Sequence, residues 1–291
     1  MKKLLLKFII FLSILGAIYF GTAIIIHYMV CRPNTFKLDK SKTILVVGSS
    51  TTQCAINDTI ISKAYNVSFS DEHYKESYAK IKLFLRDNPQ IDTVLMGYNF
   101  TNSQNDIDGT LYQNDKNGTY HHFNMYNSIF GFNEICSSVK DNPNFIFALV
   151  APRSLEIILS GRSYNRFGAY EYSGRDKLQK DIKIRETKVP DTSSIRDHYQ
   201  LIYFDKIKKL CKEKDVKLIL ITTPIYQAYK YIDTAQLNKY YKEHFSDVEW
   251  LDYKNFPLAD SCYSDIVHLH NKGTIIFSEY LRDSVLTKKP F

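Results

Sequence analysis

The stretch TILVVGSSTTQCAIND, residues 43–58, starts as an apolar run and changes character within one turn. Residues 43–47 are Leu or β-branched throughout, which is typical of a parallel strand covered on both faces. Gly48 ends the run, and hydroxyl side chains fill residues 49–52. Because a turn needs only small or polar residues, this run of hydroxyls raises the question of whether one of them is reactive.

Further apolar runs repeat the pattern, and segments with helical periodicity separate them. The additional strands are predicted at residues 64–70, 91–99, 216–224 and 248–253. Helices are predicted from an N-cap at Ser70 to Pro89, over about residues 194–214, and after His268. Strands that alternate with helices indicate a mostly parallel, five-stranded sheet with right-handed crossovers. The predicted fold class is therefore α/β, a three-layer α/β/α sandwich.

Residues 8–30 form a separate apolar segment, FIIFLSILGAIYFGTAIIIHYMV, without Asp, Glu, Lys or Arg. At about 1.5 Å per residue, a helix of this length covers the roughly 30 Å hydrocarbon core of a bilayer. A cleavable signal peptide has a shorter apolar region of about 7–15 residues and a small-residue cleavage site, which this segment lacks. We therefore predict an uncleaved transmembrane helix over residues 8–30 and a linker over residues 31–42. The lysines within residues 1–7 favour a short cytoplasmic N-terminus, with the remaining chain extracytoplasmic.

Charge and cysteine usage exclude several classes of partner. The net charge of +7 is spread along the chain without a basic block or an aromatic RNA-binding motif, so nucleic acid is not an expected partner. The five cysteines are widely spaced and form no CxxC pair, which argues against a zinc site and a disulfide scaffold. His121 and His122 lack a nearby carboxylate or thiolate pattern and are interpreted as loop residues. No metal or cofactor is expected.

The interval of about residues 100–193 interrupts the alternation and is rich in Asn, Tyr and Gly. We interpret it as an insertion in a domain that spans residues 43–291, placed over the carboxyl edge of the sheet, where open α/β folds bind ligands. Tyr164, Arg166 and Tyr170 are candidates to line a carbohydrate groove through stacking and charge-assisted hydrogen bonds. Packing of these tyrosines against the domain is an equally open alternative.

A second stretch with reactive side chains is SDIVHLHNKGTIIFSEYL, residues 264–281. Asp265 and His268 are three residues apart, so the carboxylate can accept from one imidazole nitrogen while the other nitrogen faces a nucleophile. Ser50 follows the first predicted strand, and His268 follows the last. Because the carboxyl ends of parallel strands meet at one edge of the sheet, we expect Ser50 and His268 to lie close together.

Together these motifs resemble those of the SGNH, or GDSL-like, hydrolases. The resemblance rests on Gly48-Ser49-Ser50-Thr51 after the first strand and on Asp265-x-x-His268 near the C-terminus, and it covers about residues 43–285. It implies a flavodoxin-like sandwich in which Ser50 is the nucleophile, His268 is the general base and Asp265 orients the imidazole.

The family also uses an oxyanion hole that this chain matches only in part. Its donors are the backbone N–H of the serine, a glycine after strand two and the Asn of a G-x-N motif after strand three. Asn99, in Gly97-Tyr98-Asn99, is the implied side-chain donor, with Asn102 as a substitute. Ser70 and Asp71 stand where the glycine is expected, so the backbone N–H of Asp71 would serve instead. The carboxylate of Asp71 would oppose a developing oxyanion.

The resemblance and the predicted anchor together imply a serine-dependent O-acyl ester hydrolase or O-acyltransferase of the bacterial inner (cytoplasmic) membrane. The expected substrates are cell-envelope glycans or lipid-linked sugars. The chain resembles the SGNH-like partners of membrane O-acyltransferases, such as those of alginate acetylation and D-alanyl transfer, so polysaccharide acetylation with a membrane O-acyltransferase partner is an expectation. The alternative is a catalytically inactive envelope protein that binds or scaffolds, which the position of Asp71 favours.

Overall fold

The computed structural model describes residues 1–99, 118–150, 167–174, 176–185, 198–226 and 234–286. Its contacts divide the chain into two compact units. The helical unit comprises Met1–Phe36 and Gly109–Arg166, and the sheet unit comprises Lys37–Asp108 and Phe167–Phe291. The sequence-based division, one domain over residues 43–291 with an insertion at about residues 100–193, stays a prediction.

Five parallel strands form the sheet of the sheet unit. They are β1 (Ile44–Val47), β2 (Ala64–Asn66), β3 (Thr93–Gly97), β4 (Lys217–Thr222) and β5 (Glu249–Asp252). The strand order is β2-β1-β3-β4-β5, and all four neighbouring pairs are parallel. This is the doubly wound, flavodoxin-like order, in which every connection crosses over a face of the sheet.

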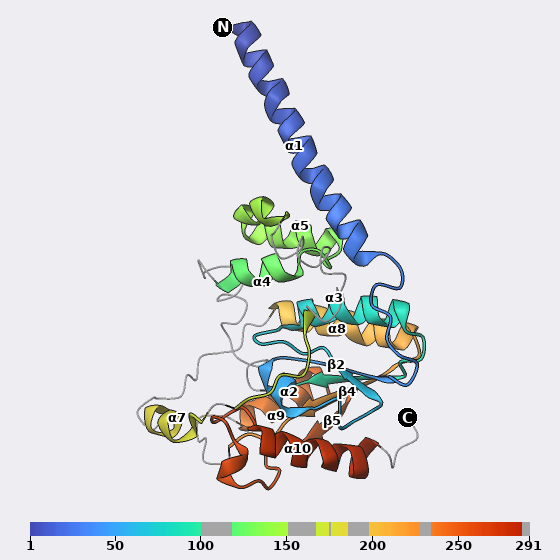
Figure 1. Cartoon of the computed structure of the whole chain (residues 1–291), viewed down its shortest axis with the longest axis vertical. Helices are drawn as coiled ribbons and strands as arrows, with labels where there is room; N and C mark the ends of the chain where they lie inside the picture. The colour runs from blue at the N-terminus through green and yellow to red at the C-terminus, as the bar shows by residue number, and fades with distance from the viewer. Residues whose placement is uncertain (100–117, 151–166, 175, 186–197, 227–233, 287–291) are drawn as a thin grey trace. The chain divides into compact units, whose positions relative to one another are not determined.

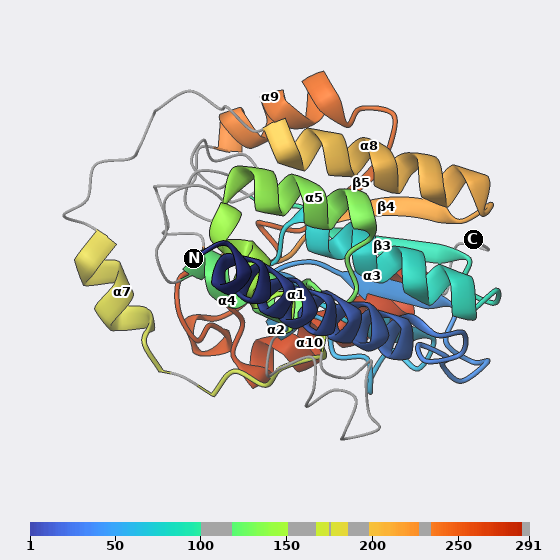
Figure 2. The same ribbon diagram turned by 90° about the horizontal axis from the view of Figure 1, so that it is seen from above.

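Helices cover both faces of the sheet (Figures 1 and 2). One face carries α3 (Tyr74–Asp87), α8 (His198–Glu213) and α9 (Thr234–His244), and the other carries α2 (Ser50–Ala55) and α10 (Asn271–Tyr280). The ring centroids of Phe204, in α8, and Phe245, directly after α9, lie 3.9 Å apart. Short helices α7 (Leu178–Arg185), η5 (Asp260–Cys262) and η6 (Leu281–Leu286) complete the unit. The predicted three-layer α/β/α sandwich is thereby confirmed.

The core of the sheet unit explains the continuous apolar character of the first strand. Ile44 and Val46 belong to one buried cluster with Leu95, Ile219 and Phe277, on the side of α10. The alternate residues of β1 face the opposite side and are also fully buried. Burial on both faces removes any polar position from the strand, which is why the run is apolar throughout.

Helix α3 begins later than the sequence predicts. Its N-cap is His73 rather than Ser70, and a capping box joins His73 to Glu76. The backbone N–H of His73 donates to the Glu76 carboxylate over 3.2 Å. Asp71 adopts a left-handed φ of 57°, which is incompatible with a right-handed helical turn and delays the start of α3.

The helical unit contains α1 (Lys2–Cys31), α4 (Gly118–Tyr126), α5 (Phe132–Asp141) and η3 (Pro143–Ala148). Polar side chains of α1 explain why residues 118–150 belong with it. The Tyr19 hydroxyl donates to the Ile146 carbonyl (2.8 Å) and accepts from the Leu149 N–H (3.1 Å). His27 Nδ1 donates to the Ser128 carbonyl over 3.0 Å.

Two further sequence predictions concern the helical unit. His121 and His122 lie in α4 rather than in a loop. Within the described part of the chain, α1 is the one helix long and apolar enough to cross a membrane, and only 6% of its apolar window is buried inside the structure. The segment predicted to span the bilayer, residues 8–30, lies entirely within this helix.

Candidate active site

Ser50 is placed by a close approach of two strands and one helix. It is the first residue of α2, directly beyond the carboxyl end of β1. Gly48 has φ of 154°, and a Cβ there would lie 2.7 Å from Thr52 Oγ1 and 3.1 Å from Gly97 Cα. A Cβ on Gly97 would lie 2.2 Å from the same Thr52 oxygen. Both glycines are therefore required for α2 to pack onto the ends of β1 and β3.

The structure brings Ser50, His268 and Asp265 together at this edge. His268 Nε2 lies 2.8 Å from Ser50 Oγ, although the two residues are 218 positions apart. His268 Nδ1 lies 2.8 Å from Asp265 Oδ2 and 3.0 Å from Oδ1. Because an ionised carboxylate only accepts hydrogen bonds, Nδ1 carries the proton and Nε2 accepts from the Ser50 hydroxyl. This is the tautomer that a general base requires.

A tight loop holds the acid and the base in register. The Ser264 N–H donates to the His268 carbonyl over 2.9 Å, and an antiparallel bridge joins Tyr263 to Leu269. Asp265 Oδ1 accepts from the backbone N–H groups of Val267 (2.9 Å) and His268 (2.8 Å). An Asp that bonds to the backbone two residues ahead is a common turn former, so one side chain both shapes the loop and orients the imidazole.

The electrostatics of Asp265 favour its ionised form. Burial opposes ionisation, but hydrogen bonds from the His268 imidazole and from the N–H groups of Val267 and His268 outweigh it. The pKa of Asp265 is therefore held below its ordinary value of 3.8. An ionised carboxylate beside Nδ1 stabilises the imidazolium that forms when His268 takes a proton.

Asn99 lies beside the nucleophile turn, with its amide engaged there. The side chain is buried, and its Nδ2 donates to Thr51 Oγ1 (2.9 Å) and to Ser49 Oγ (3.0 Å). In this arrangement the amide braces the hydroxyls on either side of Ser50. The described residues that line the pocket in front of Ser50 do not include Asn99. The substitute donor, Asn102, lies outside the described residues.

Asp71 occupies the backbone conformation that glycine adopts most readily. Its φ is 57°, a left-handed value that Asp tolerates better than most residues because its side chain is short and polar. The loop after β2 is held beside the nucleophile turn, since the Phe69 N–H donates to the Gly48 carbonyl over 3.0 Å. Asp71 is exposed and lines the pocket in front of Ser50.

That pocket has a volume of about 220 Å³. It is lined by Ser50, Cys54, Ser70, Asp71, Glu171, Tyr172, Ser173, Asp265 and His268. This volume lies below the roughly 300–1,000 Å³ of drug-sized ligand sites, so the pocket suits a small ligand. The described lining contains three carboxylates and neither Lys nor Arg.

The segment of residues 167–174 forms a wall of the pocket that the sequence does not reveal. The Glu171 N–H donates to the Gln53 carbonyl (3.3 Å), and the Asn271 N–H donates to the Ser173 carbonyl (3.2 Å). A Cβ on Gly168 would lie 2.1 Å from the Val67 carbonyl oxygen, so only glycine permits this approach. That glycine is the one local signal that could have indicated the wall.

The three residues predicted to bind carbohydrate are only partly described. Tyr170 lies in the wall segment but does not line the pocket, and its hydroxyl donates to Asn271 Oδ1 over 3.4 Å. Burial raises the pKa of this hydroxyl above its ordinary value. Tyr164 and Arg166 lie outside the described residues.

A buried ion pair fastens the wall to the loop that carries Asp71. Lys80 Nζ contacts the Glu72 carboxylate and the Val67 carbonyl, and it donates to the Phe167 carbonyl over 2.9 Å. Ser77 Oγ donates to the Glu72 carboxylate over 2.7 Å. Both charged side chains are fully buried. Burial raises the pKa of Glu72 to about 7 and lowers the pKa of Lys80.

Metal ligands and disulfides are not part of the described site. Within the described part of the chain, no three His, Cys, Asp or Glu side chains are close enough to hold a metal ion. All five cysteines are described, and none forms a disulfide. Cys54 is a buried thiol of α2 that lines the pocket, while Nε2 of His268 is directed at Ser50.

Comparisons with known proteins give similarity at the level of solved structures. No protein-family model and no curated protein matches the sequence. The chain is similar to a candidate acylhydrolase from Bacteroides fragilis, with a TM-score of 0.39 and 11% identity over 87% of this chain and 90% of that one. It is also similar to a GDSL-like lipase from Bacteroides thetaiotaomicron, with a TM-score of 0.35 and 10% identity over 87% and 91% of the two chains.

Proposed function

We propose that the protein is a serine-dependent O-acyl ester hydrolase or O-acyltransferase. The observation that carries the proposal is the 2.8 Å distance between His268 Nε2 and Ser50 Oγ, with Asp265 bonded to the opposite ring nitrogen. A hydroxyl, a correctly oriented imidazole and an ionised carboxylate are the components that activate a serine nucleophile.

In the proposed reaction, Ser50 Oγ attacks the acyl carbonyl carbon while His268 Nε2 takes the hydroxyl proton. The tetrahedral intermediate collapses, the bond to the leaving alcohol oxygen breaks, and the imidazolium returns the proton to that oxygen. Water or a sugar hydroxyl then attacks the acyl-enzyme, with His268 again as base and then as acid. Hydrolysis and transfer differ only in which hydroxyl reaches the acyl carbon.

The oxyanion donors of this proposal are backbone N–H groups of Ser50 and Asp71 and the side-chain amide of Asn99. For Asn99 to donate, one of its bonds to Ser49 or Thr51 must be exchanged for the oxyanion. Losing one such donor typically costs about 2.7–4 kcal/mol of transition-state stabilisation.

We further propose that α1 anchors the protein in the inner membrane of a bacterium, with the sheet unit outside the cytoplasm. The helix is long and apolar enough to cross a bilayer, and lysines precede its apolar part. An enzyme that shares a surface with its substrate gains effective concentration. Cell-envelope glycans or lipid-linked sugars are therefore the proposed acceptors or substrates, with a membrane O-acyltransferase as partner if the reaction is transfer, as in polysaccharide acetylation.

The second candidate function is a catalytically inactive envelope protein that binds or scaffolds. Two observations favour it: the Asp71 carboxylate lines the pocket, and the amide of Asn99 is engaged with hydroxyls of the turn. Such a protein would keep the sandwich and lack turnover.

Hydrolysis of p-nitrophenyl acetate by the full-length protein in detergent separates the two candidates. We expect turnover by the wild type and its loss in Ser50→Ala, because that change removes the nucleophile. Ser62→Ala is the matched control, since Ser62 is exposed in the connection between β1 and β2. Equal rates for the wild type and Ser50→Ala would favour the inactive envelope protein and contradict the serine-dependent enzyme.

A further inference from the structure

Helix α5 of the helical unit buries two of its polar side chains and leaves its apolar stripe partly exposed. Phe132, Ile135, Cys136 and Val139 follow the spacing of one helical stripe. Phe132 is 80% exposed, and Cys136 is also exposed. On the opposite side, Glu134 and Ser138 are buried. Water-soluble helices show the reverse arrangement, so this stripe is matched to an apolar surrounding.

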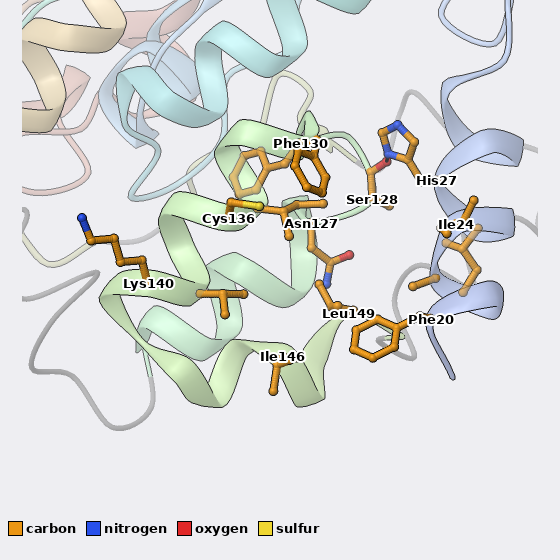
Figure 3. A pocket seen from close by; sticks show the side chains of 15 residues that line it. Phe20, Ile24, His27, Asn127, Ser128, Phe130, Cys136, Lys140, Ile146 and Leu149 are labelled. Atoms are coloured by element: carbon orange, nitrogen blue, oxygen red, sulfur yellow. Dashed lines mark hydrogen bonds between the residues drawn. The ribbon is translucent and has the colours of Figure 1, made fainter. Parts of the chain in front are cut away.

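The stripe forms one side of a large apolar cavity within the helical unit (Figure 3). Its volume is about 640 Å³, within the range of about 300–1,000 Å³ typical of ligand sites. Phe20 and Ile24 of α1 form the facing side, and Ile146 closes one end. Lys140 is the one Lys or Arg among the described lining residues, and it lies away from α1 (Figure 3).

The position of the cavity along α1 indicates its surroundings. About 20 helical residues span the hydrocarbon core, so a span that begins at Phe8 ends near His27. Phe20 and Ile24 then lie within the outer half of the bilayer. Tyr19, which lies at the same level, is bonded to the backbone at Ile146 and Leu149. The residues that cover α1 there must also reach the acyl chains of the outer leaflet.

We propose that this cavity binds an acyl chain of an outer-leaflet phospholipid, with the headgroup phosphate at Lys140. This inference rests on the membrane anchorage proposed above and is independent of the ester chemistry. The apolar lining matches the chain, and the single ammonium matches the phosphate. Phe147 is 76% exposed in η3, one residue after the Ile146 carbonyl that binds Tyr19, and it provides a second apolar contact with the leaflet.

Native Cys136 allows a direct test, because it lines the cavity and is the exposed one of the five cysteines. The full-length protein is labelled there with a bimane fluorophore and placed in vesicles of phosphatidylethanolamine and phosphatidylglycerol with brominated acyl chains. We expect the label to lose most of its fluorescence to the brominated chains and to be protected from aqueous iodide. In Lys140→Gln, quenching by either brominated phospholipid should fall, because both carry the phosphate assigned to Lys140. Unchanged quenching in this variant would overturn the phosphate contact.

Two control variants are built on Cys136→Ser, which also shows that labelling is specific. Asn133→Cys places the label at an exposed polar position of α5, where iodide should quench it and brominated chains should not. Ile14→Cys places it in the exposed middle of α1, where brominated chains must quench it if the helix spans the bilayer.

The outcomes separate the cavity from the anchor. A quenched label at position 14 with an iodide-accessible label at Cys136 would overturn the lipid site and leave the anchor intact. A label at Cys136 that neither quencher reaches would show that the cavity is closed to both water and lipid, which also overturns the proposal. A label at position 14 that brominated chains do not quench would contradict both the membrane anchor and the lipid site. The proposed ester chemistry would be unaffected, because the esterase assay tests it separately.

Discussion

The two sides of Ser50 differ in how completely they are assembled for ester chemistry. On the base side, His268 and Asp265 are within 2.8 Å of their partners, and a loop bonded to itself holds them there. On the oxyanion side, the amide of Asn99 is bonded to the hydroxyls beside the nucleophile, and Asp71 contributes a carboxylate to the pocket. The residues proposed to transfer protons are therefore in hydrogen-bond contact, and in the proposed reaction the stabilisation of negative charge decides whether the protein catalyses turnover.

The difference has a structural origin. The base side is built from residues 262–270, a single loop whose geometry is local. The oxyanion side needs the ends of three elements, which are the turn after β1, the loop after β2 and the residues after β3. Each part has its own packing demands, and a small rearrangement in one of them removes a donor. Local geometry is therefore more robust than geometry shared among elements.

The largest effect should come from the base side, in Asp265→Asn. The neutral amide does not accept the hydrogen bond from Nδ1–H as a carboxylate does. The required tautomer and the stabilised imidazolium are therefore both lost. We expect kcat for p-nitrophenyl acetate to fall by a factor on the order of 10⁴. Because the pKa of Asp265 is lowered, its stabilising contribution is present above pH 3.8 and is lost as the pH falls below that value. In Asp265→Asn this acid-dependent part of the unfolding free energy should be absent. An unchanged kcat for p-nitrophenyl acetate would contradict the role assigned to Asp265.

The next effect is expected in Lys80→Met, which breaks the ion pair that joins the wall segment to the loop carrying Asp71. Glu72 then remains buried without its cation, and we expect the free energy of unfolding to fall by about 3–5 kcal/mol. Burial already raises the pKa of Glu72 from 4.5 to about 7, so its contribution to stability falls as the pH rises through this range. In Lys80→Met that fall should extend to higher pH, as measured by urea unfolding. The double variant Glu72→Gln/Lys80→Met is the control and should recover part of the loss.

Asn99→Ala distinguishes a donor from a brace. If the amide turns to the oxyanion during the reaction, kcat should fall by about 10²–10³-fold with little change in KM. A brace of Ser49 and Thr51 alone would instead lower the melting temperature and leave kcat of the folded protein unchanged. We expect the loss in kcat, and the melting temperature of the same preparation is the accompanying measurement.

The smallest effect is expected in Asp71→Gly, and it should be a gain. Glycine adopts φ of 57° without strain, so the backbone N–H keeps its place while the carboxylate is removed. Less repulsion at the oxyanion should raise kcat several-fold for a neutral ester. Asp71→Asn, which keeps the side-chain size, should give a similar rise, and a fall in both variants would show that the carboxylate binds substrate.

Much of the sheet unit could be predicted from sequence because its signals are local. The strands β1 and β3 and most of β4 are buried and largely apolar, and parallel topology brings the end of the first strand and the loop before the last helix to one edge. The sequence predicts Ser50 and His268 at that edge for this reason, and their side-chain atoms Oγ and Nε2 lie 2.8 Å apart. The sequence predicts the start of α3 at Ser70 because serine is a good N-cap by residue type. The left-handed backbone at Asp71 excludes this start, and the N-cap is His73.

The remaining features depend on contacts between distant segments. Glu171 and Ser173 line the pocket and are held by backbone hydrogen bonds, which their residue types do not reveal. The one local signal is Gly168, because its approach to the Val67 carbonyl leaves no room for a Cβ. The hydrogen bonds of the Asn99 amide to Ser49 and Thr51 depend on its side-chain rotamer, which the sequence does not specify. The grouping of residues 118–150 with α1 depends on Tyr19 and His27, two polar residues in an otherwise apolar segment. The sequence does not predict these hydrogen bonds, because the apolar pattern of residues 8–30 indicates a helix that faces lipid on all sides.

Labelling with a fluorophosphonate probe tests the reactivity of Ser50 most directly. The probe reacts only with an activated hydroxyl, so the full-length wild type should gain one phosphonyl adduct, located at Ser50 by mass spectrometry of its peptides. His268→Ala should gain none, because the base is missing. A wild-type protein that remains unlabelled, or an adduct that persists in His268→Ala, would contradict an assembled triad.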